Sequence, residues 1–152
     1  MTPHIEFKKV WEDNDVYELA MSACDGRSIF CTNLYAGVIE LQTISNELRQ
    51  FSPGIYGGLY DLRIGEFGPE YASGALMVRF AFDQTGSGKI FLTVSVESEW
   101  FETPQTKVAS NARLYLKSEA ILLNQFISEF SQLASGNGKI AQLEGISYPE
   151  FS

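Results

Sequence analysis

Two carboxylates near the middle of the chain have the spacing of an acid–base pair. Glu97 and Glu99 stand two residues apart in the stretch VESEWFE. On a strand that runs through Glu99, both side chains project from the same side, about 6.6 Å apart. That spacing is near the range for paired carboxylates in glycoside hydrolysis. Adjacent carboxylates on a solvated strand face are far commoner than catalytic ones, so a hydrolase is the least favoured of three hypotheses for this chain.

The same segment is a better candidate for a partner-binding surface. Trp100 and Phe101 fall where the expected strand gives way to a loop containing Pro104, with Glu97, Glu99 and Glu102 beside them. Aromatic anchors surrounded by charge are typical of protein interfaces. The alternative is that one of the two rings closes the end of the hydrophobic core.

A second candidate surface lies in the glycine-rich stretch IYGGLYDLRIGEFGPEYASG. Its candidate contact residues are the aromatic side chains Tyr60, Phe67 and Tyr71. We rank it as the weaker of the two surfaces.

The stretch TGSGK resembles the end of a phosphate-binding loop but fails its pattern. The first glycine of G-x-x-x-x-G-K-[ST] would fall on Asp83, and the hydroxyl residue after the lysine would fall on Ile90. Apolar and polar residues alternate on both sides, which predicts two half-buried strands joined by a glycine-rich turn. A turn between strands provides no helix N-terminus for a phosphate.

The remaining reactive side chains do not suggest a catalytic or metal site. His4 is the single histidine, so neither a triad nor a histidine-based metal site is expected. Cys24 and Cys31 flank Asp25-Gly26, a strong hairpin signal. A two-residue turn there places Cys24 opposite Arg27 and separates the cysteines by roughly 13 Å, too far for a disulfide. We therefore expect free thiols, and no cofactor.

The elements that must position these residues follow from periodicity. The sequence predicts helices over 40–51 and from an N-cap at Ser118 to a C-terminal glycine at Gly136. Alternation predicts strands near 4–11, 16–24, 27–35, 58–66, 75–83, 89–99 and 107–117, with a further edge strand from Ile140. Connections between the strands are too short for parallel crossovers. The expected fold is α+β, with one twisted antiparallel meander of about six or seven strands and both amphipathic helices on one face.

Composition bounds the class of protein. The 152 residues fit one domain, 1–152, and 45% are hydrophobic. The sequence contains no apolar run of the ~20 residues that cross a bilayer, and no signal peptide is evident, so a cytoplasmic location is expected. The net charge of −8 argues against nucleic-acid and anionic-membrane partners. It can keep the protein soluble or steer a basic partner.

The order of features resembles a group of small bacterial proteins. A Trp follows the first strand, then come GRSIFCTNLY, a helix LQTISNELRQF, the meander GALMVRFAFDQTGSGKIFLTVSV and a closing helix SEAILLNQFISEFSQL. Over roughly residues 5–134 this pattern is similar to immunity proteins of the WapI kind, which protect bacteria from their own contact-delivered toxins. The resemblance rests on hydrophobic positions and transfers no catalytic residue.

The favoured hypothesis is a non-enzymatic, cytoplasmic protein-binding module, and the resemblance implies an immunity protein. Its acidic surface would complement a basic toxin, because electrostatic attraction speeds capture. The alternative from a different class is a small-molecule-binding protein with a pocket between sheet and helices. The sequence leaves the oligomeric state open.

Overall fold

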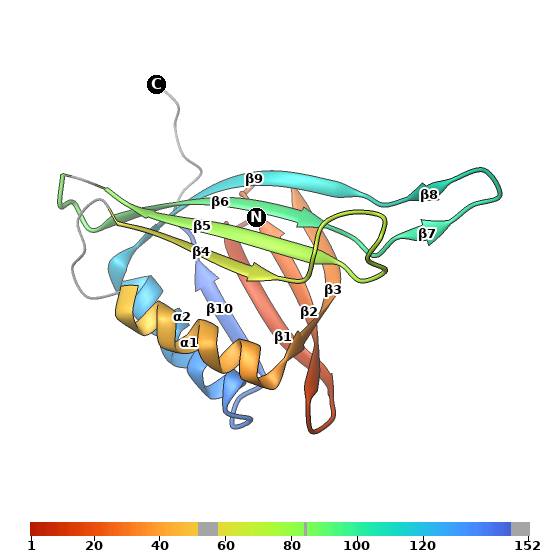
Figure 1. The fold of residues 1–152 in the computed structure, drawn as a ribbon. Helices are drawn as coiled ribbons and strands as arrows, with labels where there is room; N and C mark the ends of the chain where they lie inside the picture. The colour runs from red at the N-terminus through yellow and green to blue at the C-terminus, as the bar shows by residue number, and fades with distance from the viewer. Residues whose placement is uncertain (52–57, 84, 147–152) are drawn as a thin grey trace.

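The computed structural model describes residues 1–51, 58–83 and 85–146. The fold is α+β with antiparallel strands, as expected (Figure 1). The described residues form ten strands and two helices, which are β1 (His4–Glu12), β2 (Val16–Cys24), β3 (Ile29–Gly37), α1 (Val38–Phe51), β4 (Leu59–Ile64), β5 (Ala75–Phe82), β6 (Lys89–Glu97), β7 (Phe101–Glu102), β8 (Lys107–Val108), β9 (Asn111–Glu119), α2 (Ala120–Ala134) and β10 (Ile140–Glu144).

The strands do not form the single expected sheet. Two four-stranded sheets have the orders β10-β1-β2-β3 and β4-β5-β6-β9, and β7 and β8 form a separate hairpin. Each helix connects the two larger sheets: α1 joins β3 to β4, and α2 joins β9 to β10. The single-sheet prediction is wrong because it paired strands that are neighbours in sequence, whereas the chain changes sheet at each helix. Figure 1 shows the helices side by side beneath the β4-β5-β6-β9 sheet.

The two sheets and both helices share one hydrophobic core. The inner side chains of β5 and β6 belong to it, as the alternation predicts. Phe7 of β1 contacts two rings of α2, with centroids 6.2 Å from Phe126 and 5.9 Å from Phe130. The predicted apolar face of α2 is confirmed, because its buried residues are Leu123, Phe126, Ile127, Phe130, Leu133 and Ala134.

The ends of α2 confirm one predicted cap and correct the other. Gly136 has a φ of +84°, the left-handed conformation expected of a C-terminal glycine. Ser118 is not the N-cap: it is buried in β9, and its hydroxyl donates a 2.6 Å hydrogen bond to the carbonyl of Glu144. Glu119 takes the N-cap position without a side-chain capping bond, and the first helical N–H, of Ala120, donates to the carbonyl of Gly88 instead. A tertiary contact therefore replaces the local cap.

The TGSGK stretch is a hairpin turn between β5 and β6, as predicted, although residue 84 lies outside the described residues. Gly86 and Gly88 have φ angles of 74° and 77°, which only glycine adopts readily. One carboxylate oxygen of Asp83 accepts from the N–H of Thr85, and the other accepts from the hydroxyl of Ser87. These bonds hold the pKa of Asp83 below its ordinary value.

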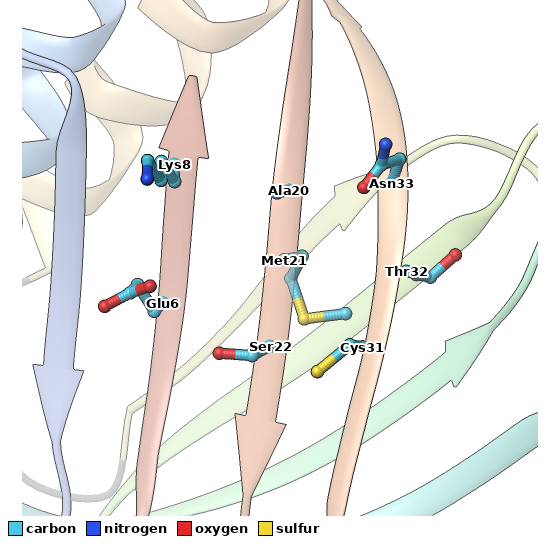
Figure 2. A pocket seen from close by; sticks show the side chains of 8 residues that line it. All are labelled: Glu6, Lys8, Ala20, Met21, Ser22, Cys31, Thr32 and Asn33. Carbon is cyan, nitrogen blue, oxygen red and sulfur yellow. The ribbon is translucent and has the colours of Figure 1, made fainter. Parts of the chain in front are cut away.

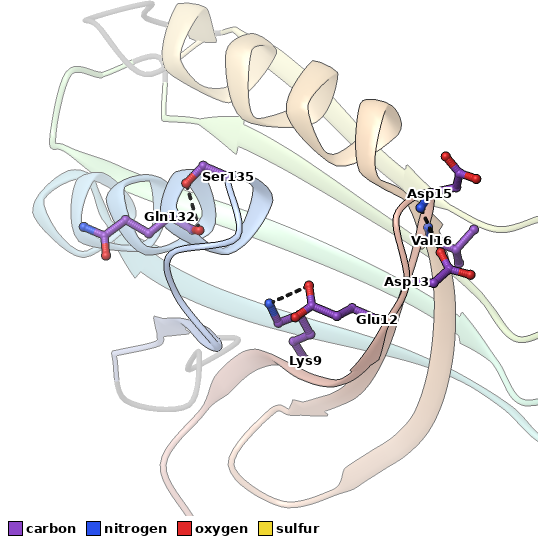
Figure 3. Close-up of polar contacts among 7 residues, drawn as sticks. All are labelled: Lys9, Glu12, Asp13, Asp15, Val16, Gln132 and Ser135. Atoms are coloured by element: carbon purple, nitrogen blue, oxygen red, sulfur yellow. Dashed lines mark hydrogen bonds and ion pairs between the residues drawn. The ribbon is translucent and has the colours of Figure 1, made fainter.

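An aspartate also organises the turn between β1 and β2. One carboxylate oxygen of Asp13 accepts from the backbone N–H groups of Asp15 and Val16, both at 2.8 Å, as Figure 3 shows for this corner of the molecule. These bonds lower the pKa of Asp13. Beside the turn, the ammonium of Lys9 lies 3.1 Å from the carboxylate of Glu12 (Figure 3).

The β2–β3 hairpin has a longer turn than the expected Asp25-Gly26 pair. The N–H of Asp25 donates to the carbonyl of Ser28, and the carboxylate of Asp25 accepts from the N–H groups of Arg27 and Ser28. Residues 25–28 therefore all belong to the turn, and Cys24 pairs with Ile29 rather than Arg27. The predicted register is wrong by two residues, which leaves each side chain on its predicted face.

The shift changes the environment of the cysteines but not their state. Cys31 pairs with Ser22 and is exposed, whereas Cys24 is buried. Both are free, which confirms the prediction of free thiols.

A glycine allows the two sheets to approach where β3 meets the start of β5. A Cβ atom on Gly74 would lie 2.8 Å from the carbonyl oxygen of Asn33 in one sheet. It would also lie 3.1 Å from the carbonyl oxygen of Glu97 in the other. Because both neighbours are backbone atoms, neither can move aside without disturbing its strand. We call this contact the sheet junction.

Replacement of Phe130 by Ala should lower the free energy of unfolding by about 3–5 kcal/mol, because the ring is fully buried and its loss leaves a cavity. Urea denaturation measures the change. An unchanged unfolding midpoint would contradict the assignment of Phe130 to the core.

Replacement of Gly74 by Ala should cost about 1–3 kcal/mol, since an added methyl group collides with backbone at the sheet junction. Gly37→Ala is the matched control: its nearest neighbours lie 3.8 Å away and its φ is not positive. The control should change stability by less than about 0.5 kcal/mol. Equal losses in the two variants would show that close approach at residue 74 is not the cause.

Candidate functional site

The two surfaces predicted from sequence meet at one end of the molecule. The β4–β5 loop, residues 65–74, carries Phe67 and Tyr71, and residues 97–110 carry the other candidate segment. The N–H of Trp100 donates to the carbonyl of Ala72 at 3.2 Å, and the ammonium of Lys107 lies 3.5 Å from the carbonyl of Pro69. Figure 1 shows the loop beside the β7–β8 hairpin, which projects beyond the sheets. We call this region the acidic end.

Glu97 joins the two segments. It is the last residue of β6, so the strand ends before Glu99, and the expected strand through Glu99 is wrong. One oxygen of the Glu97 carboxylate accepts from the N–H of Gly68 at 2.9 Å and from the indole N–H of Trp100 at 3.0 Å. Gly68 has a φ of 122°, which aims its N–H at this oxygen at little steric cost. The carboxylate therefore positions both the loop and the ring.

Trp100 is held in place rather than displayed. Its ring is half-buried, its indole N–H is bonded to Glu97 and its backbone N–H to Ala72. Truncation of this side chain would release the β4–β5 loop as well as remove a contact. The sequence suggested Trp100 as an exposed anchor; in the structure the neighbouring ring of Phe101 is the more exposed of the two.

The exposed apolar side chains of the acidic end come from both segments. Phe101 and Val108 face each other across β7 and β8, with 61% and 45% of their surfaces exposed. Phe67 and Tyr71 are 44% and 49% exposed on the adjacent loop. Glu102, on the same hairpin as Phe101, is exposed and lies 3.7 Å from the ammonium of Lys107. Large apolar groups surrounded by carboxylates thus face solvent together.

Tyr60 does not belong to this surface. It lies near the start of β4, five residues or roughly 16 Å of strand away from the loop at Gly65. Its ring packs on Phe51 and Phe80, and its hydroxyl donates a 3.0 Å hydrogen bond to Glu47. Burial, followed by that bond, raises the pKa of Tyr60 well above its usual value. The structure therefore separates Tyr60 from Phe67 and Tyr71.

A pocket of about 290 Å³ opens beside the loop. Tyr35 from β3, Glu40 from α1 and Phe67 from the loop line it, together with Arg63 and Glu66. Burial, and the nearby charge of Glu66, raise the pKa of Glu40. The pocket therefore combines two aromatic walls with the carboxylates of Glu40 and Glu66 and the guanidinium of Arg63. Its lining carries one negative group in excess, which favours an incoming positive charge.

The negative field extends to the next strand. Glu18 stands opposite Tyr35 in the β2–β3 register. The charge of Glu18, then burial, then the charge of Glu99 raise the pKa of the Tyr35 hydroxyl. Seven carboxylates surround the acidic end against two basic side chains, Arg63 and Lys107; the seven are Glu18, Glu40, Glu66, Glu70, Glu97, Glu99 and Glu102.

Sequence reasoning missed the contribution of β2, β3 and α1. Tyr35 and Glu40 are far along the chain from residues 97–102, and only the junction of the two sheets brings them together. One signal was present: in the correct hairpin register Glu18 lies opposite Tyr35, whereas the two-residue turn pairs Glu18 with Asn33. Because the predicted turn was two residues too short, the predicted register did not place Glu18 beside Tyr35.

A second hollow, of about 240 Å³, lies on the outer face of the β10-β1-β2-β3 sheet. Figure 2 shows Glu6 and Lys8 on one side of it and Cys31 and Asn33 on the other, with the short side chain of Ala20 between. The small-molecule hypothesis expected a pocket between sheet and helices. The inner side chains of the described sheets and helices form one apolar core, and the pocket beside Tyr35 takes its lining from a strand and from helix α1. The small-molecule alternative stays a prediction.

Two structural searches cover residues 1–51, 58–83 and 85–146. Within these ranges, no group of three or more His, Cys, Asp or Glu side chains is placed to hold a metal ion. No helix in the described part of the chain is long and apolar enough to cross a membrane.

Comparison with protein-family models, curated proteins and solved structures finds no match for this chain. The site must therefore be interpreted from its own geometry.

Replacement of Glu97 by Ala should loosen the acidic end, since the N–H of Gly68 and the indole of Trp100 lose their acceptor. Bonds to a charged group contribute about 1.5–3 kcal/mol each, so a measurable fall in stability is expected. In a Trp11→Phe background, Trp100 reports alone, and its emission should shift to longer wavelength as the ring becomes wetter.

Glu102→Ala, at an exposed carboxylate on the same segment, is the control and should leave stability and emission unchanged. Wild-type emission and stability in Glu97→Ala would show that the carboxylate does not position the loop.

Proposed function

We propose that this chain is a non-enzymatic, cytoplasmic protein-binding module whose acidic end captures a basic partner protein. The observation that carries the proposal is the grouping of exposed Phe67, Tyr71, Phe101 and Val108 among carboxylates at one end. Exposed apolar groups of this size with a charged surround are typical of interaction surfaces. The resemblance to immunity proteins of the WapI kind suggests a protein toxin as the partner.

Capture and retention depend on different groups of this surface. The carboxylates at its rim, such as Glu66, Glu99 and Glu102, accelerate encounter with a basic protein through long-range attraction. Phe101 is the best anchor, because it is the most exposed of the described rings and belongs to β7 of the projecting hairpin. Binding would bury that ring, and buried aromatic anchors dominate interface energies.

The pocket beside Tyr35 adds a specific place for a charged side chain. A lysine or arginine of the partner that enters it would approach Glu40 and Glu66 between the rings of Tyr35 and Phe67. Both the carboxylates and the aromatic faces attract a cation. This combination favours a basic partner over a neutral one.

The test begins with capture from a lysate of the native host, followed by surface plasmon resonance on the purified partner. The Glu66→Gln, Glu99→Gln, Glu102→Gln triple variant should associate about tenfold more slowly at low salt and dissociate normally, because rim charges act on encounter. Phe101→Ala should instead accelerate dissociation and cost about 2 kcal/mol or more.

Glu6→Gln, Glu12→Gln, Glu144→Gln is the charge-matched control on the other sheet, and it should bind like the wild type. Identical association rates for the two triple variants would refute capture by the acidic end. A captured protein that is acidic, or whose binding survives Phe101→Ala unchanged, would refute the proposed partner chemistry.

A further inference from the structure

No helix or strand of the described residues covers the outer face of the β4-β5-β6-β9 sheet. Figure 1 shows both helices and the other sheet on the opposite side. Alternation places every second residue of the four strands on this outer face, where Phe91 and Tyr115 are 45% and 49% exposed. Three neighbouring cross-strand rows make up what we call the basic face. The first contains Phe91 and Lys117, the second Arg79 and Tyr115, and the third Arg63 and Arg113.

The charge of the basic face is opposite to that of the protein. Its rows carry Arg63, Arg79, Arg113 and Lys117 against one carboxylate, Asp61, a formal charge of +3. Since the whole chain carries −8, the rest of it carries −11. The total charge used to exclude nucleic acid therefore does not describe this face.

Two exposed aromatic rings stand among these cations. Phe91 pairs with Lys117, and Tyr115 pairs with Thr93, so the rings lie diagonally across neighbouring strands β6 and β9, about 7–8 Å apart at the backbone. The ammonium of Lys117 lies 5.9 Å from the centre of the Phe91 ring. Arg113 is two residues from Tyr115 on the same side of β9.

The third cation is held in a defined orientation. The guanidinium of Arg79 donates to both oxygens of Asp61, at 2.8 and 2.9 Å. In the register, Arg79 lies opposite Thr93, in the same cross-strand row as Tyr115 and one row from Phe91. Its position is therefore fixed beside the aromatic pair before any ligand arrives.

We propose that the basic face binds a short stretch of single-stranded nucleic acid, with bases stacked on Phe91 and Tyr115 and phosphates beside Lys117, Arg113 and Arg79. Open four-stranded sheets with paired aromatic rings stack two or three bases in this way. Nucleic-acid bases stack on exposed, planar rings, whereas the binding of an acidic protein requires only positive charge. The two exposed rings therefore favour nucleic acid over an acidic protein. The negative charge elsewhere confines a polyanion to this face and limits its footprint.

The test is fluorescence anisotropy with a labelled oligouridine of about eight nucleotides, a length within the range that single-strand-binding domains cover. Three phosphate contacts predict that affinity falls roughly 20-fold between about 50 and 200 mM salt, from a slope near −0.7 per contact. Phe91→Ala and Tyr115→Ala should each weaken binding about tenfold, without a change in melting temperature.

The controls are Phe67→Ala and Phe101→Ala, which remove exposed rings from the acidic end and should leave oligouridine binding unchanged. These variants also separate this proposal from the previous one, since they impair partner capture and not nucleic-acid binding. Lys117→Glu should abolish binding by placing a negative charge beside the rings.

Two outcomes would overturn the proposal. One is the absence of binding at about 50 mM salt and up to about 1 mM protein, well beyond the usual non-specific range. The other is competition by polyglutamate as effective as that by unlabelled oligouridine, with no effect of Phe91→Ala or Tyr115→Ala. That result would assign the face to an acidic protein partner instead.

Discussion

The sheet junction at Gly74 is the constraint on which the rest of the structure depends. Two four-stranded sheets share one core, and at this point their backbones approach so closely that a methyl group on Gly74 would collide with the carbonyl of Asn33. The two helices lie where the sheets are not in contact and contribute their apolar faces to the same core. Both parts of the acidic end meet the sheet junction at one of their ends. The β4–β5 loop ends at Gly74, and the 97–110 segment begins at Glu97, whose carbonyl oxygen also lies close to Gly74. The candidate binding surface is therefore a product of how the sheets meet.

The same arrangement separates charge by sign. Carboxylates from β2, α1 and the two loops gather at the acidic end, whereas the outer rows of the β4-β5-β6-β9 sheet carry a surplus of arginine and lysine. The net charge of −8 therefore combines regions of opposite sign, and each region favours molecules of the opposite charge. Arg63 lies at the border, since it belongs to the basic face and also lines the pocket of Glu40. A charge near such a border orients an approaching partner as well as attracting it.

Local features of the fold could be predicted from the sequence, and long-range ones could not. The apolar stripe of α2, its terminal glycine Gly136 and the glycine turn after Asp83 depend on neighbouring residues, so periodicity and turn chemistry suffice. The pairing of His4 with Glu144, which makes β10 a strand of the first sheet, depends on a contact across nearly the whole chain. A helix between two strands also does not reveal whether the chain changes sheet, because the next strand can join either sheet. The β2–β3 register depended on hydrogen bonds that Asp25 makes within a four-residue turn, which the Asp-Gly pair alone does not specify.

For the candidate site, the sequence identified two segments that the structure brings together, but not the position of each side chain. Phe101, Phe67 and Tyr71 are exposed, as the two predicted surfaces require. Trp100 is half-buried, however, and Tyr60 packs against the core. What distinguishes Trp100 is a hydrogen-bond acceptor three residues earlier, the Glu97 carboxylate, which also holds the N–H of Gly68. The β4–β5 loop and the segment after β6 are thereby fixed relative to each other. Since ordering loops on binding costs free energy, a surface ordered in advance retains more of its contact energy as affinity. In the proposed complex, the half-buried tryptophan and its carboxylate would thus contribute to recognition without contact with the partner.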